Sequence, residues 1–443
     1  MRTGLCLAVA AACCCGAPAQ KRVPDAPQPR RAEMLRVLSS RLPDLPSVPP
    51  SVSIPVDPLG FAPPGPIYLG QRNAMASLDF MGENRLLFTF RVPGLIRRDP
   101  NDDGESDERK IRALVLDLPT GTVEEQALWT VHDRSRYLWM LHDGRFVLRD
   151  RETLLIGNAS LELKPWLRFP GPVRWLELDP TQQYVVTDSV EPAATPNAAG
   201  EAAGPVTASA TADGENANAP ANIVLRVLRL PAGNAMLVTR VRTPIHLAIN
   251  SEGYLDNMRG KGDNWIVSLN YFSGGTTNLG SIDSNCGPSR EFVADKEFLM
   301  TGCQPDGTFS LVAMTTEGRT LWQRQIAAES IWPLLTMAPD GSRFARETLS
   351  STHMVSTFQP LSTDDIQGQL VRVFDAATGN VALETSASPV LDVGGNVAIS
   401  PSGRRVAVLN AGAIQIFDLP APPPLPADST STTSNPAANA PRH

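Results

Sequence analysis

The 443-residue sequence is poor in charge and has no long segment of helical periodicity. Charged residues make up 19% of the chain, against about 25% in an average globular domain. The net charge is −7 and no long basic run occurs, whereas nucleic-acid binding requires a clustered Lys/Arg surface. No long segment repeats its apolar residues with a period of about 3.6, as a helix would. The sequence therefore argues against a nucleic-acid partner, a helical bundle and a coiled coil.

Familiar catalytic and metal-binding motifs are also missing. The chain has five histidines, and none of them are spaced as metal ligands: His132, His142, His246, His353 and His443. No Gly-x-Ser-x-Gly nucleophile elbow is present. The pairs His132-Asp133 and His142-Asp143 are predicted to lie near strand ends, in turn or strand-edge roles. The sequence thus names no catalytic and no cofactor-binding residue, which favours a binding protein over an enzyme.

The chain has no apolar run of the roughly 20 residues that a membrane helix needs. Residues 5–15 form an apolar run of 11 residues after Arg2, and Ala17-Pro18-Ala19 follows it. A short apolar run before small residues is the pattern of a cleaved secretory signal peptide. We therefore predict a signal peptide over residues 1–19, no membrane span, and export to the periplasm or the exterior. The alternative is a lipoprotein leader, with acylation at one of three cysteines: Cys13, Cys14 or Cys15.

Cysteine is nearly absent after this leader. Four of the six cysteines lie in it, which leaves Cys286 and Cys303. An even number of cysteines in an exported chain predicts a disulfide, which would stabilise the fold by about 3 kcal/mol. The alternative is two reduced, buried cysteines, because neither has a CxxC or metal-ligand spacing.

Proline and glycine are abundant instead, with 40 and 33 residues, and most of the prolines are confined to three segments. Residues 20–66 are predicted to be a Pro-rich N-terminal arm, and residues 419–443 a disordered Pro/Ser/Thr-rich tail. Residues 190–221 have almost no large apolar side chains. Because such a segment cannot bury enough surface to offset its ordering entropy, we predict a disordered insert there.

Between residues 67 and 418, short apolar or alternating runs are separated by turns, which predicts an all-β domain. The clearest strand candidates are residues 86–92, 113–118, 223–228, 265–269, 310–314, 371–374 and 406–409. One turn type, with Pro, Asp, Asn, Ser or Gly at its corners, occurs seven times: residues 81–84, 142–145, 179–182, 250–253, 294–297, 338–341 and 400–403. A second type closes hairpins further along the chain: residues 118–122, 230–234, 315–319 and 376–380.

Once insertions are subtracted, the first turn type recurs about every 40–50 residues, which is the repeat length of a four-stranded propeller blade. We therefore predict a seven-bladed β-propeller of four-stranded antiparallel blades over residues 67–418. The last repeat lacks a strand, since only the Pro-rich tail follows residues 414–418. An open ring would leave two exposed sheet edges. We predict that a strand within residues 52–72, around 66–69, completes this blade.

Some of these repeats resemble known propeller families. Ala338-Pro339-Asp340-Gly341 and Ser400-Pro401-Ser402-Gly403 resemble the turn of WD40-like and YVTN-type β-propellers, and residues 371–379 resemble the strand and turn that follow it. Residues 310–325 are similar to a quinoprotein-type repeat. The Gly-His and Trp-Asp signatures of true WD40 repeats are missing. As a whole, the chain resembles exported bacterial β-propeller proteins that have no assigned activity.

Residues 99–107 form the sharpest local motif, D-x-N-x-D-G-x-x-D. Oxygen ligands at alternate positions, with a glycine that permits a tight turn, suit Ca²⁺. The predicted ligands are Asp99, Asn101, Asp103, Glu105 and Asp107, and calcium is the one candidate cofactor. The motif resembles the calcium loops of integrin-type propeller blades and thrombospondin-type repeats, although Lys110 stands where an EF-hand has its glutamate. The alternative is an acidic loop that only adds solubility.

A propeller fold by itself does not define a function. We expect an exported, monomeric scaffold that binds a protein, a glycan or a small ligand without catalysis. The alternative is a periplasmic propeller enzyme (a hydrolase, a lyase or a quinone-dependent dehydrogenase) with its site at the central channel. Converging carboxylate, histidine or arginine side chains with shifted pKa values at the channel would favour the enzyme. A flat, mixed surface would favour the binding module.

Overall fold

The computed structural model of the protein describes residues 48–65, 73–94, 108–133, 135–191, 223–326, 331–351 and 366–424. All of them lie in the compact unit that begins at Leu45. Apart from one 3-10 turn, η1 (Asp57–Leu59), every regular element in these ranges is a strand. The predicted all-β class is confirmed. Among these residues, no helix has the length and apolar character needed to cross a membrane.

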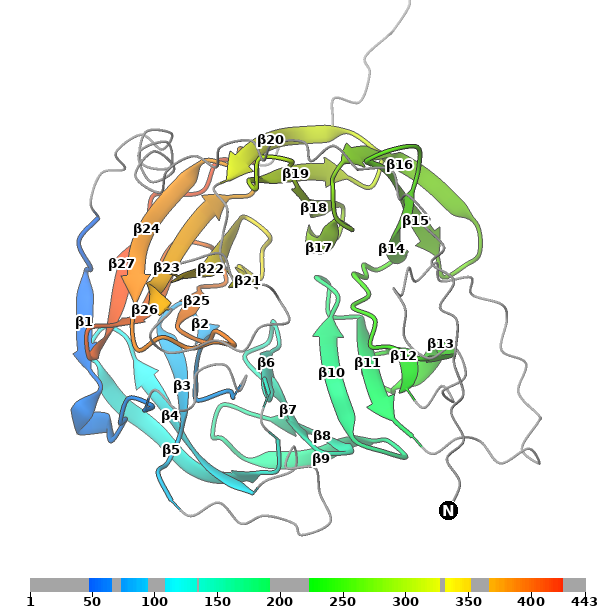
Figure 1. Cartoon of the computed structure of the whole chain (residues 1–443). Coiled ribbons are helices and arrows are strands. Elements are labelled where there is room, and N and C mark those ends of the chain that lie inside the picture. Colours follow the sequence, from blue (N-terminus) through cyan, green and yellow to red (C-terminus); the bar gives the residue numbers. More distant parts are fainter. Residues whose placement is uncertain are drawn as a thin grey trace, which may run out of the picture. The chain divides into compact units, whose positions relative to one another are not determined.

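Seven antiparallel sheets, the blades, are arranged around a central channel (Figure 1). Blade 1 contains β2 (Ala76–Gly82), β3 (Arg85–Arg91), β4 (Arg109–Asp117) and β5 (Thr122–Val131). Blade 2 contains β6 (Leu138–Met140), β7 (Phe146–Asp150), β8 (Thr153–Gly157) and β9 (Leu163–Arg168). Blade 3 contains β10 (Val173–Leu178), β11 (Tyr184–Val190), β12 (Ile223–Arg229) and β13 (Asn234–Val241). Blade 4 contains β14 (Gly253–Arg259), β15 (Asn264–Tyr271) and β16 (Thr276–Asp283).

The remaining three blades complete the ring. Blade 5 contains β17 (Ser289–Ala294), β18 (Glu297–Cys303), β19 (Phe309–Thr315) and β20 (Thr320–Ile326). Blade 6 contains β21 (Ile331–Met337), β22 (Arg343–Ser351), β23 (Ile366–Asp375) and β24 (Val381–Ala387). Blade 7 contains β25 (Val397–Ile399), β26 (Arg405–Asn410), β27 (Ala413–Asp418) and β1 (Val52–Pro55). The prediction of seven blades is therefore confirmed.

The two predicted turn types occupy fixed places in the blades. All seven turns of the first type lead from the innermost segment of a blade into its next strand, and the four of the second type join the third strand to the outermost. Blade 4 differs because its inner segment makes only an isolated bridge, between Ile249 and Tyr254, and is not a regular strand. The backbone amide of Leu255 still donates to the Ala248 carbonyl at 2.9 Å. Six blades are thus four-stranded as predicted, and blade 4 has three regular strands.

The N-terminal strand β1 closes the ring. It pairs with β27, with Val52 opposite Ile416 and Ile54 opposite Ile414, and the two strands lie side by side in Figure 1. A closing strand within residues 52–72 was predicted correctly, but its placement around residues 66–69 was wrong, because β1 already occupies the edge of β27. Residues 66–72 lie outside the described ranges.

The segment around β1 belongs to the core and is not part of an arm. Ile54 and Val56 are buried against the strands of blades 7 and 1. Phe61, just after η1, packs with its ring centroid 5.5 Å from those of Phe88 and Phe90. The propeller therefore begins before residue 67, inside the segment that composition assigned to the Pro-rich arm.

The other predicted boundaries also move by a few residues. Val190 ends β11, and the Glu191 carboxylate forms an ion pair with Arg226 at 2.5 Å, so the insert cannot begin at residue 190. Leu419 is buried, and its amide donates to the Arg404 carbonyl at 2.8 Å, so it belongs to the fold and not to the tail. The signal peptide, Cys13, Cys14 and Cys15, residues 192–222 and residues 425–443 lie outside the described ranges.

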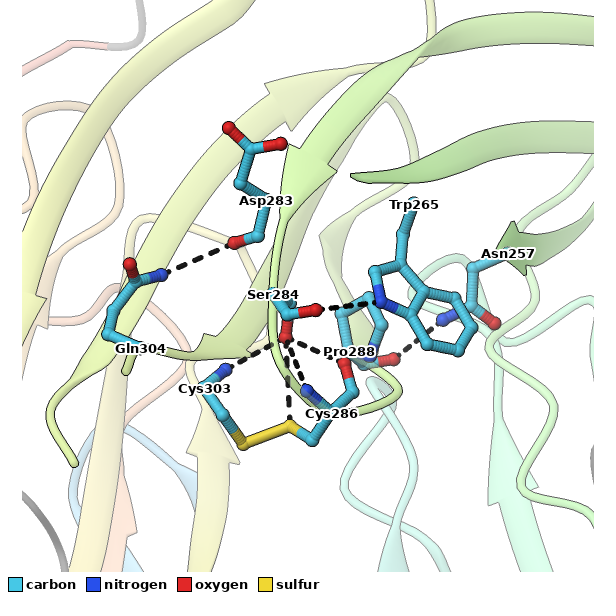
Figure 2. The surroundings of a disulfide bond; sticks show 8 residues. All are labelled: Asn257, Trp265, Asp283, Ser284, Cys286, Pro288, Cys303 and Gln304. Carbon is cyan, nitrogen blue, oxygen red and sulfur yellow. Dashed lines mark hydrogen bonds between the residues drawn. A yellow bond between two sulfur atoms is a disulfide. The ribbon is translucent and has the colours of Figure 1, made fainter. Parts of the chain in front are cut away.

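A disulfide joins Cys286 to Cys303 between blades 4 and 5 (Figure 2). Ser284 organises the surrounding backbone, because its Oγ accepts from the Cys303 amide at 2.9 Å and donates to the Cys286 carbonyl at 2.7 Å. Asn257 of β14 adds a second link by donating from Nδ2 to the Pro288 carbonyl at 2.8 Å. These contacts fix the connection that leads into β17, the strand that carries Glu291 into the channel.

Candidate functional site in the central channel

The inner strands of the blades enclose a cavity of about 370 Å³. Strands from six blades contribute to its wall: β2, β6, β10, β17, β21 and β25. Apolar residues make up the larger share of the wall, and charged, titratable and aromatic side chains lie among them: Asp79, Arg136, Trp139, His142, Arg149, Arg174, Trp175, Glu177, Asp179 and Glu291. An apolar cavity with a few convergent polar groups is the usual form of a small-molecule site.

Glu177 of β10 and Glu291 of β17 meet in this cavity from blades 3 and 5. Their carboxyl groups hydrogen-bond to each other. Burial raises the pKa of both groups, and the negative charge of Glu177 raises the pKa of Glu291 further. Two carboxylates in contact cannot both ionise unless a cation compensates them. The pair therefore keeps a shared proton to a higher pH than an isolated glutamate would.

Asp79 of β2 supplies a third carboxyl group. Ser77 donates a hydrogen bond from Oγ to Asp79 Oδ2 at 2.5 Å. Burial raises the pKa of Asp79 to about 6, although this hydrogen bond and the charge of Arg136 both act to lower it. Asp79 is therefore mostly ionised at neutral pH, and it becomes protonated in mild acid.

Arg136, in the segment before β6, is one of three arginines that line the cavity. Its Nε donates to the Leu138 carbonyl at 3.1 Å, and its guanidinium carbon lies 5.2 Å from the centre of the Trp139 ring. Such cation–π contact holds the charged group in place. The positive charge of Arg136 favours the ionised forms of Asp79 and Glu177.

Two imidazole groups near the channel are neutral at pH 7. His142 lies in the turn after β6 and lines the cavity, and burial lowers its pKa. Its backbone amide donates to Gln182 Oε1 at 2.7 Å, which joins the turns of blades 2 and 3. His246 packs edge-on against Trp175, with 4.8 Å between the ring centroids, and burial lowers its pKa as well.

Most of the residues singled out in the sequence lie outside the channel. His132 has the expected strand-edge role, since its backbone amide donates to Asp150 Oδ1 at 2.8 Å. The predicted disulfide between Cys286 and Cys303 is present in the structure. The predicted calcium ligands all lie outside the described ranges: Asp99, Asn101, Asp103, Glu105 and Asp107. Among the described residues, no three His, Cys, Asp or Glu side chains are grouped so as to hold a metal ion.

The channel carboxyls were not found in the sequence, although a signal for them exists. Asp79 and Glu177 each lie two residues before a turn of the first type, and Glu291 lies three residues before one. In three other blades, the residue two positions before that turn also lines the cavity: Met140, Thr336 and Ala398. Aligning the repeats on their turns would have placed an acidic side chain in the channel in two of the seven blades, with Glu291 one residue from the corresponding position.

Comparisons with known proteins show a likeness in fold alone. No protein-family model matches the chain, and no curated protein matches its sequence. The C-terminal WD40 domain of Sif2 is 9% identical over 84% of this chain and 98% of that one, with a TM-score of 0.41. The WD40 domain of Toxoplasma gondii coronin is 10% identical over 78% and 89%, with a TM-score of 0.41. Pyrococcus horikoshii acylaminoacyl peptidase is 10% identical over 76% of this chain and 49% of that one, with a TM-score of 0.45. The strand pairing of the chain itself shows a seven-bladed β-propeller.

Proposed function

We propose that the protein is an exported, non-enzymatic binding propeller that holds a small ligand in its central channel. The cavity around Glu177 and Glu291 carries this proposal. Its volume, about 370 Å³, falls in the range of small-molecule sites, about 300–1,000 Å³. The pattern of a signal peptide at residues 1–19 and the disulfide between Cys286 and Cys303 support export, because disulfides persist in oxidising compartments.

The charged groups favour a site inside the channel over a flat outer surface. Converging carboxyl groups with raised pKa values were the feature expected of an enzyme, and they are present here. However, Glu177 and Glu291 contact each other and do not stand apart, as the two carboxyls that flank a glycosidic bond would. Among the described residues that line the cavity, neither Ser135 nor Thr336 hydrogen-bonds to a histidine that would activate it. This geometry suits binding better than covalent catalysis.

Filling the channel is expected to abolish ligand binding. Thr336 of β21 lines the cavity and is half-buried, so a tryptophan in its place would occupy the space that a ligand needs. A thermal-shift screen of small cationic, anionic and neutral compounds should give hits with the wild type that disappear in Thr336→Trp. Thr320→Trp, on the exposed side of β20, is the matched control and should keep every hit. A screen without hits, or hits that survive in Thr336→Trp, would contradict a channel site.

One observation favours a hydrolase as the second candidate. Two hydrogen-bonded carboxyl groups that share a proton form the acid–base pair with which aspartic proteases activate water. Glu177 and Glu291 have this relation, with raised pKa values. Turnover of chromogenic ester, peptide or glycoside substrates by the wild type, lost in Glu291→Gln, would establish this candidate in place of simple binding.

A further inference from the structure

We propose that the channel ligand carries an ammonium or guanidinium group that inserts between Glu177 and Glu291, in place of the hydrogen bond that joins them. This inference rests on the proposed function, because it names the chemistry of the ligand for that same cavity. It commits the site to an organic cation with a short apolar body. The following contacts lead to it.

No described arginine or lysine forms an ion pair with Glu177 or Glu291, although the positive charge of Arg136 favours ionised Glu177 and that of Arg290 favours ionised Glu291. Arg290 is the nearest neighbour of Glu291 in the chain, but its guanidinium is engaged with blade 4. Its Nε donates to the Leu255 carbonyl at 2.9 Å, and its Nη1 donates to Asn257 Oδ1 at 2.6 Å. In the ligand-free channel, a shared proton therefore joins the two glutamates.

Arg136 does not fill this role either. It is fixed by the Leu138 carbonyl and the Trp139 ring, and it acts on Asp79 as well as on Glu177. Besides the pair itself, the charged or titratable side chains that line the cavity are Asp79, Arg136, His142, Arg149, Arg174 and Asp179. Arg149 is already paired with Asp133 at 2.7 Å. A ligand cation would thus find two carboxyl groups with which no described arginine or lysine forms an ion pair.

The other side chains that line the cavity indicate the chemistry of the rest of the ligand. Apolar side chains make up the larger share of the same cavity wall, and Trp175, two residues before Glu177 on β10, also lines it. Such a wall suits a short alkyl chain, and an aromatic face attracts an organic cation. Since no three acidic, His or Cys side chains among the described residues are grouped for a metal ion, an organic cation fits better than a divalent metal.

Three five-carbon probes of different charge test the proposal. Cadaverine is the cation, 1,5-pentanediol the neutral analogue and glutarate the anion, and each is titrated calorimetrically into the full chain at pH 6. Cadaverine should bind, and repeating its titration in buffers of different ionisation enthalpy should show proton release, because the ammonium displaces the shared proton. N-acetyl-lysine amide, titrated in the same way, distinguishes a protein side chain from a free amine as the source of the cation.

Variants of the pair separate this inference from a structural effect. Glu291→Gln should weaken cadaverine binding about tenfold or more, because a charged hydrogen bond is lost. The double variant E177Q/E291Q should bind cadaverine more weakly than either single variant, and any binding that remains should release no proton. Glu125→Gln, at an exposed position on β5 outside the channel, is the matched control and should leave affinity and proton release unchanged.

The outcomes of these experiments distinguish a wrong ligand class from a wrong binding site. Stronger binding of glutarate or pentanediol than of cadaverine, lost in Thr336→Trp, would overturn the cationic ligand while leaving the channel site in place. Cadaverine binding to the wild type without proton release would also overturn the inference. So would a cadaverine affinity in E177Q/E291Q equal to that of the wild type. Failure of every compound class in the thermal-shift screen would overturn the channel site itself.

Discussion

Replacing Ile54 with aspartate is expected to lower the free energy of unfolding by on the order of 4 kcal/mol, as measured by urea denaturation. Ile54 lies in β1, is 5% exposed, and packs in the cluster that joins blade 7 to blade 1. A charge there would be desolvated without a partner. Because domains are stable by only about 5–15 kcal/mol, this single change would remove a large part of the total.

The neighbouring residue gives a matched control for this effect. Ser53 belongs to the same strand but is exposed, since successive side chains of a strand point to opposite faces. Ser53→Asp introduces the same charge and should change the free energy of unfolding by less than about 0.5 kcal/mol. Equal midpoints for Ile54→Asp and the wild type would mean that β1 does not close the ring.

Asp188→Asn is expected to stabilise the protein at pH 8 relative to the wild type, and to have little relative effect at pH 4. Asp188 on β11 is 2% exposed and lies opposite Trp175 of β10. Burial raises its pKa to about 7, against an opposing hydrogen bond from the Ile245 backbone amide. The folded state therefore holds a proton that the unfolded chain has released above about pH 4.

The sign of the pH effect follows from this difference. Because the folded pKa is raised, the stability that the protonated carboxyl provides is complete below about pH 4 and is lost as the pH rises to about 7. Asparagine has no proton to lose, so the stability difference between variant and wild type should grow by on the order of 3 kcal/mol between pH 4 and pH 8. Urea denaturation at several pH values measures it. Asp283→Asn, at an exposed position at the end of β16, is the control. A difference that is flat with pH would contradict an ionisation penalty at Asp188.

The repeat pattern could be predicted from the sequence because it depends on local chemistry. A turn such as Ala338-Pro339-Asp340-Gly341 needs Pro to fix one corner, and Gly341 adopts a φ of +72°, which favours glycine. The disulfide could be predicted because only two cysteines, Cys286 and Cys303, remain after the leader. These features require only nearby residues and a count of the repeats.

Features that depend on packing between distant segments were harder to predict. Val52 and Ile54 of β1 and Val56 just after it form an alternating apolar pattern, but the prolines around β1 suggested an arm. In blade 4, Pro244 stands just before the inner segment at 245–249, which makes only an isolated bridge. From the sequence, an acidic residue such as Glu177 in a short strand is expected to be exposed. Only the closed ring of blades places it at the channel.

Direct titration of the channel carboxyls tests the central claim, that Glu177 and Glu291 form a ligand site and share a proton that a cation displaces. Carbon-13 NMR of the side-chain carboxyl groups of labelled glutamate, with Glu177→Gln and Glu291→Gln to assign the signals, follows both groups in the ligand-free protein. The two should titrate as a coupled pair, with one step well above the ordinary pKa of glutamate. Adding cadaverine should lower that step. Two independent titrations near the ordinary value, unchanged by cadaverine, would contradict the claim.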